Sequence, residues 1–120
     1  MKTNQKTHYT AVLCKSRHDI RDVFNRAIEQ NVFPQECTMD MRNLQDLAVI
    51  YMSKLHTMLD ETYGTRKKAH ESIILDVYVT GFTPALIALV NVRNLYYKDL
   101  PLILWHYDMR IKGYIPQVVI

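Results

Sequence analysis

Three short polar segments follow apolar runs in this 120-residue chain, and they hold residue types that bind anions. They are residues 15–18 (KSRH), residues 80–83 (TGFT) and residues 106–108 (HYD). Hydroxyl groups, cationic side chains and the backbone N–H groups at a helix start are common donors to phosphate. The candidate ligand-binding residues are therefore Lys15, Ser16, Arg17, His18, Thr80, Gly81, Thr83 and His106.

Several other kinds of site lack their characteristic residues. No G-x-G-x-x-G or G-x-x-x-x-G-K-[ST] pattern follows an apolar run, which argues against a dinucleotide fingerprint and a P-loop. The sequence also lacks the G-x-S-x-G elbow of many hydrolases, which argues against that class of enzyme. Cys14 and Cys37 have no zinc-ligand spacing, so we expect reduced thiols and neither a metal nor a cofactor. If the protein is an enzyme, His18 or His106 is the candidate acid or base.

The elements that position these residues follow from the apolar pattern. Residues 8–14 predict a first strand. A helix is then predicted from Ser16 to about Asn31, because Ser16 and Asp19 resemble a capping box and an apolar stripe continues at helical spacing. The members of that stripe are Ile20, Val23, Phe24, Ala27 and Ile28.

Further elements alternate along the rest of the chain. A long helix is predicted from Thr38 or Asp40 to Gly64, and residues 73–79 predict a strand buried in a parallel sheet. A helix over residues 85–97 should follow, with Thr83 as N-cap and Pro84 at the first helical position. Residues 100–106 predict a further strand. Residues 114–120 predict an edge strand, where Pro116 is tolerated. Residues 32–33 fit either a short strand or an apolar plug.

This order predicts a single α/β domain over residues 1–120. We expect a small three-layer, Rossmann-like domain with a mainly parallel central sheet and an antiparallel C-terminal edge strand. In such sheets ligands bind at the carboxyl ends of the strands, where the three polar segments would meet. The predicted buried residues are Val12, Phe24, Ile28, Leu47, Val77, Val79, Leu86, Leu89, Ile103 and Leu104.

The segments VLCKSRHDI, DVYVTGFTPALIALVNV and LILWHYD resemble a known family. They are similar to small stand-alone Rossmann-like proteins related to the CRISPR-associated Rossmann fold, which includes sensors, sponges and ring nucleases for cyclic oligoadenylates. The similarity covers residues 11–20 and 74–117 and leaves the long second helix unmatched. It implies ligand contacts from Ser16, Arg17, His18, Thr80, Gly81 and Thr83, and a role in antiviral defence.

The leading functional hypothesis is a protein that binds and sequesters a phosphate-bearing nucleotide, such as a cyclic oligonucleotide messenger. Two alternatives stay open: a slow phosphodiesterase on the same site, and a protein-interaction inhibitor without a small ligand. The formal charge of +3 tolerates an anion but is below that of a duplex-DNA reader.

Two further expectations concern partners and location. Apolar residues on the long helix, namely Tyr51, Met52, Met58 and Tyr63, predict a homodimer. The first residues contain no apolar core of a signal peptide, and every apolar run is shorter than a membrane span. Both features predict a cytoplasmic protein without membrane contact.

Overall fold

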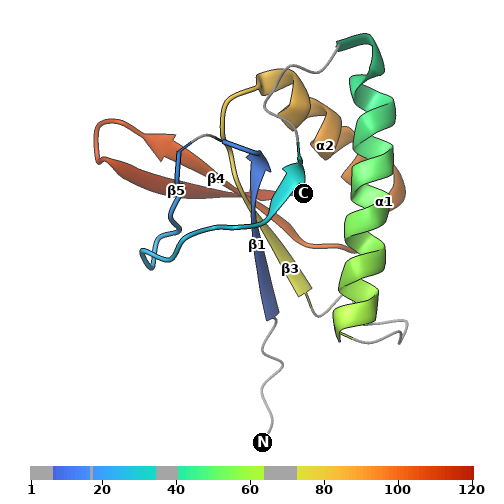
Figure 1. Ribbon diagram of the computed structural model, residues 1–120, viewed down its shortest axis with the longest axis horizontal. Helices are drawn as coiled ribbons and strands as arrows, with labels where there is room; N and C mark the ends of the chain where they lie inside the picture. The colour runs from blue at the N-terminus through green and yellow to red at the C-terminus, as the bar shows by residue number, and fades with distance from the viewer. Residues whose placement is uncertain (1–6, 17, 35–40, 64–72) are drawn as a thin grey trace, which may run out of the picture.

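The computed structural model of the chain describes residues 7–16, 18–34, 41–63 and 73–120, which form a five-stranded sheet and two α-helices (Figure 1). The strands are β1 (Thr7–Cys14), β2 (Asn31–Phe33), β3 (Ile73–Tyr78), β4 (Leu102–Asp108) and β5 (Gly113–Val119). The helices are α1 (Leu44–Tyr63), which follows a 3-10 turn at Met41–Asn43, and α2 (Thr83–Tyr96).

The strand order in the sheet is β2-β1-β3-β4-β5, and only the β4–β5 pair is antiparallel. This order confirms the predicted α/β class, the mainly parallel sheet and the antiparallel C-terminal edge strand. Pro116 lies in the middle of β5, and a residue without an N–H group is tolerated there because β5 has a free edge. The described part of the chain contains no helix that is both long and apolar enough to cross a membrane.

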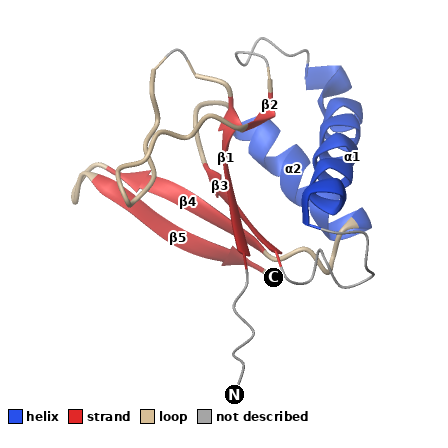
Figure 2. Cartoon of the chain, turned by 60° about the horizontal axis from the view of Figure 1, so that its bottom comes forward, coloured by secondary structure: helices blue, strands red, loops and turns tan. Residues whose placement is uncertain are grey.

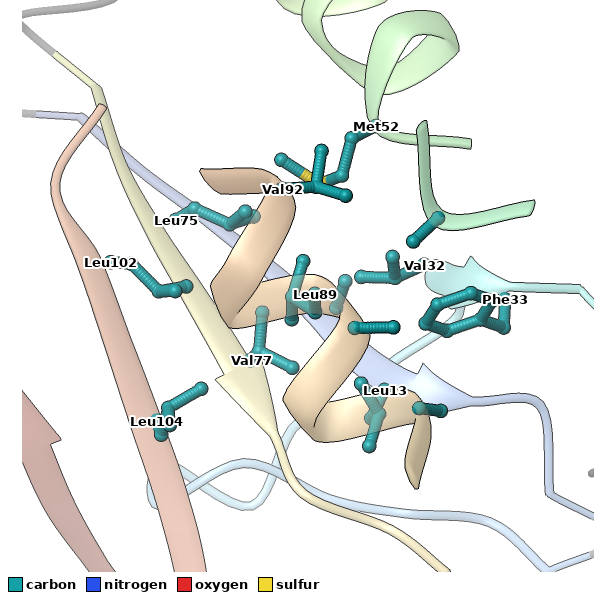
Figure 3. Close-up of a cluster of buried hydrophobic side chains, with 14 of the residues drawn as sticks. Leu13, Val32, Phe33, Met52, Leu75, Val77, Leu89, Val92, Leu102 and Leu104 are labelled. Atoms are coloured by element: carbon teal, nitrogen blue, oxygen red, sulfur yellow. The ribbon is translucent and has the colours of Figure 1, made fainter. Parts of the chain in front are cut away.

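Both helices pack against one face of the sheet, which we name the helix face (Figure 2). The side chains of Leu13, Val77 and Leu89 are completely buried there and bring together β1, β3 and α2 (Figure 3). Among the predicted buried residues, Val12, Val77, Leu89 and Leu104 are buried, whereas Ile28, Leu47, Val79, Leu86 and Ile103 are half-buried.

The opposite face of the sheet, which we name the loop face, is covered in part by a loop that contains residues 18–30 (Figure 2). The backbone N–H of Val23 in this loop donates to the Tyr78 hydroxyl of β3 at 3.0 Å. The third layer is thus a loop, and the helix predicted between Ser16 and Asn31 is wrong.

A tight turn replaces that helix. The Asp22 carboxylate accepts from the backbone N–H groups of Phe24 and Arg26, both at 2.9 Å. Asn25 has a φ of 62°, in the left-handed region that asparagine tolerates better than most residues, and Arg21 forms an antiparallel bridge with Ala27. Because side-chain acceptors compete with helical hydrogen bonds, the apolar spacing did not decide the conformation. Phe24 is 73% exposed, so its predicted burial is also wrong.

Three of the four apolar residues that motivated the homodimer prediction pack within the chain itself. Met52 is completely buried, and Tyr51 and Met58 are half-buried against the core. The Tyr51 ring meets the Phe33 ring edge-on, with centroids 5.8 Å apart. The surplus apolar area that motivated the homodimer is therefore absent at these residues. The Tyr63 side chain, Thr38, Asp40 and Cys37 lie outside the described residues.

Candidate functional site

The carboxyl ends of β1 and β3 lie side by side at the place where the strand order reverses. From β1 the chain moves outward to β2, whereas from β3 it moves the other way to β4. Open α/β sheets bind ligands at such a switch point, because the two loops part there and leave a crevice. We name residues 14–16 and 80–83 the carboxyl edge.

A side chain that follows β3 ties the two halves of the carboxyl edge together. The Thr80 hydroxyl donates to the carbonyl oxygen of Cys14 at 2.9 Å and accepts from the N–H of Cys14 at 3.2 Å. On the other side, the Lys15 N–H donates to the Phe33 carbonyl at 3.0 Å. These bonds set the path of the chain that enters the Lys15-Ser16 segment.

Lys15, Ser16 and His18 line a cavity of about 410 Å³ between the loop and the β1–β2 side of the sheet. Lys15 and His18 are exposed, and Ser16 is half-buried. The Ser16 hydroxyl accepts from the His18 N–H at 3.1 Å, so it closes a local turn and does not cap a helix. Asp19 and Glu29 also line the cavity, which gives its wall both signs of charge.

The start of α2 differs from its prediction. Phe82, in an extended conformation, occupies the N-cap position, and no side chain caps the helix. Thr83 is therefore the first helical residue, not the N-cap, and Pro84 follows it in the first turn. Gly81 is exposed at a φ of 71°, a backbone conformation that favours glycine.

Among the predicted site residues that the structure describes, His106 does not join the others. His106 lies within β4, and its Nε2 is 2.8 Å from Oε1 of Gln117 on β5. It thus makes a cross-strand contact, and β4 continues past it to Asp108. Arg17 lies outside the described residues. The carboxyl edge therefore gathers Lys15, Ser16, Thr80, Gly81 and Thr83, with His18 beside it.

The prediction missed a buried carboxylate on the loop face. Asp76, in the centre of β3, is 5% exposed. Its Oδ2 lies 2.5 Å from Nδ1 of His8, and its Oδ1 accepts from the Trp105 Nε1–H at 3.0 Å. Asp76 is the one charged residue in the apolar run 73–79, and that single departure was the available sequence signal.

The turn that covers this group is stabilised by charge. Burial alone would raise the pKa of Asp22, but hydrogen bonds from the backbone N–H groups of Arg26 and Phe24, together with the Arg26 guanidinium, outweigh burial and lower the pKa. Burial raises the pKa of Tyr78, and the nearby Asp22 and Asp76 carboxylates act in the same direction. Tyr78 is thus a neutral phenol at pH 7, and its ring stacks on Trp105 with centroids 5.4 Å apart.

The arrangement can hold an anion at the carboxyl edge through Lys15, hydroxyl groups and the backbone at the start of α2. Within the described ranges, no group of three or more His, Cys, Asp or Glu side chains could hold a metal ion. Cys14 is a buried thiol outside any disulfide.

No protein-family model matches this chain, and neither a curated protein nor a solved structure matches it significantly. The chemistry of the carboxyl edge is therefore inferred from the contacts of its own residues.

Proposed function

We propose that the chain binds a phosphate-bearing nucleotide at the carboxyl edge, and that this ligand is a cyclic oligonucleotide messenger which the protein sequesters. The main support is the pair of hydrogen bonds between Thr80 and the Cys14 backbone. They hold the Lys15-Ser16 segment next to the start of α2 at the topological switch point, where sheets of this class bind ligands.

The electrostatics of the carboxyl edge also favour an anion. Lys15 supplies a full positive charge, and the N-terminus of the 14-residue helix α2 supplies a partial one that no capping side chain screens. Thr83 adds a hydroxyl group on the same edge, whereas the single O–H of Thr80 is already donated to the Cys14 carbonyl. The acidic residues Asp19 and Glu29 line the adjoining cavity and disfavour an anion there, so the proposed phosphate position is at Lys15 and the start of α2.

The size of the site bears on the ligand. A cavity of about 410 Å³ is within the range of about 300–1,000 Å³ found for small-ligand pockets. A cyclic oligonucleotide is larger than this and carries several phosphates. We therefore include in the proposal a homodimer in which two carboxyl edges hold one symmetric ligand.

Binding without cleavage is the proposed outcome. His106 is engaged with Gln117 in the β4–β5 ladder, away from the carboxyl edge. His18 is exposed, and its described polar contact is a backbone bond to Ser16. A phosphodiesterase needs an acid or base held in a fixed orientation against the phosphate. His18 lines the adjoining cavity, but no described side chain orients its ring, which supports binding without cleavage.

The test is retention of nucleotides by the purified protein. The chain is incubated with cyclic di-, tri- and tetranucleotides, freed of unbound ligand, denatured, and the released nucleotide is chromatographed. Release of intact cyclic nucleotide is expected, with light scattering showing two protein chains per ligand. Release of linear nucleotide would instead indicate a phosphodiesterase. Retention of no nucleotide would overturn the proposal and leave an interaction protein as the remaining hypothesis.

A further inference from the structure

A second cavity, of about 280 Å³, lies on the loop face between β1, β3, β4 and the Asp22 turn. Aromatic rings of Phe24, Tyr78 and Trp105 form much of its wall. Two polar side chains of β1, His8 and Thr10, also reach it, together with the Asp76 carboxylate. Flat aromatic walls with a few polar groups are typical of sites for small planar ligands.

Burial of the Asp76 carboxyl group lowers the stability of the fold, which suggests that this residue is kept for another role. Burying a charged group is unfavourable, and well-packed apolar residues often replace buried ion pairs without loss of stability. Ile74, the neighbour of Asp76 on the same face of β3, is apolar, so an apolar side chain suits this face of the strand. Asp76 nevertheless engages both His8 and Trp105, so its role is to hold two other side chains in place.

The hydrogen bond between Asp76 and His8 determines which histidine nitrogen is available. A carboxylate only accepts, so Nδ1 of His8 carries the hydrogen in this contact. In the neutral ring, Nε2 is then an acceptor. The described residues supply no hydrogen-bond donor to it. In this neutral form His8 offers an acceptor beside the aromatic wall, and Asp76 is a positioning residue for it.

The charges around this cavity favour a ligand that donates hydrogen bonds. Arg26 is paired with Asp22, with Nε 3.1 Å from Oδ2, and also lies over the Phe24 ring. Two carboxyl groups, of Asp22 and Asp76, line the cavity against the one guanidinium of Arg26, so the cavity does not favour phosphate. We propose that it binds a flat aromatic group that carries an N–H donor, as in an aromatic amine or a nitrogen heterocycle. This site is separate from the proposed nucleotide site and does not depend on it.

The single tryptophan of the chain reports directly on this site, because Trp105 is part of the cavity wall. The experiment follows the indole N–H resonance of Trp105 in the ¹⁵N-labelled protein during titration with aniline and, separately, with toluene. The two probes have nearly the same shape, but only aniline donates a hydrogen bond. We expect saturable shifts with aniline at millimolar concentration and roughly tenfold weaker binding of toluene, the effect of one net hydrogen bond.

Two variants test the assignment to His8. His8→Phe keeps a planar ring at a half-exposed position but removes the acceptor, so the preference for aniline should disappear while toluene still binds. Thr10→Val tests the neighbouring hydroxyl and should leave most of that preference intact. Lys15→Ala is the matched control at the carboxyl edge and should bind aniline as the unmodified chain does.

The contradicting results are distinct for the two sites. Equal binding of both probes to the unmodified chain, or a preference that survives His8→Phe, would overturn the role of His8. No shift with either probe would overturn the cavity as a ligand site. Neither result bears on nucleotide retention at the carboxyl edge, so failure of one proposal is distinguishable from failure of the other.

Discussion

The helix face and the loop face of the sheet use the same strands for different purposes. On the helix face, the buried alternate residues of β1 and β3 are all apolar and pack under the helices: Ala11, Leu13, Ile73, Leu75 and Val77. On the loop face, the residues between them include Thr10, Asp76 and Tyr78, and the covering loop leaves cavities. The helix face therefore supplies stability, and the loop face with the carboxyl edge supplies polar chemistry. Substitutions on the two sides should separate these roles.

The largest expected effect is on the helix face. Leu89 of α2 is completely buried in the core, and its truncation removes apolar contacts and leaves a cavity. Leu89→Ala should lower the free energy of unfolding by about 2–5 kcal/mol in urea denaturation. Ile87→Ala, on the same helix at 57% exposure, is the control and should change it by less than about 0.5 kcal/mol. Similar losses for both variants would contradict the assignment of the core.

A smaller effect is expected for the buried carboxylate on the loop face. Asp76→Ala leaves the Trp105 Nε1–H and His8 Nδ1–H groups without their acceptor, which should cost about 1–3 kcal/mol of unfolding free energy. Asp76→Asn keeps one acceptor oxygen and should cost less. If Asp76→Ala is as stable as the unmodified chain, the carboxylate does not support the loop face.

The smallest stability effect is expected at the turn over the loop face. Asp22→Ala removes the acceptor of two backbone N–H groups at a partly solvated site. It should lower the free energy of unfolding by about 1 kcal/mol at pH 7. Because folding lowers the pKa of Asp22, its contribution is complete above the pKa of an unfolded aspartate, about 3.9, and is lost as pH falls through the folded value.

The melting temperatures of the unmodified chain and Asp22→Ala should therefore differ at pH 7 and converge below about pH 4. Asp19→Ala, at an exposed position of the same loop, is the control and should melt like the unmodified chain at either pH. A difference that stays constant down to pH 2 would show that the Asp22 charge has no part in the turn.

The comparison of the two faces also explains which features the sequence could predict. The predictions of β3, β4 and α2 are confirmed. They rested on apolar runs and on Pro84, and burial on the helix face decides the conformation of these segments. The segment 18–30 failed because its conformation depends on Asp22 and Asn25 contacts within a turn, while its apolar spacing fits a helix. Competing local hydrogen bonds of this kind are not visible in periodicity.

The candidate site was predicted only in part for the same reason. Residues at strand ends could be placed on one edge of the sheet from the element order, and Lys15, Ser16 and Thr80 lie there. The contacts of His106 with Gln117 and of His8 with Asp76 depend on strand register and pairing across β5 and β1. Neither pairing follows from residue types alone, so His106 was assigned to the site and His8 was missed.

The central claim, that the carboxyl edge binds a phosphate-bearing ligand, is tested most directly by calorimetric binding of cyclic tetra-adenylate to Lys15→Ala. The matched control is Lys98→Ala, which removes the same charge from an exposed position at the other end of α2. We predict that Lys15→Ala weakens binding by about 1.5–3 kcal/mol, the range for a hydrogen bond to a charged group, with an unchanged melting temperature. Equal affinities of the Lys15→Ala and Lys98→Ala variants, or no binding by the unmodified chain, would contradict the claim.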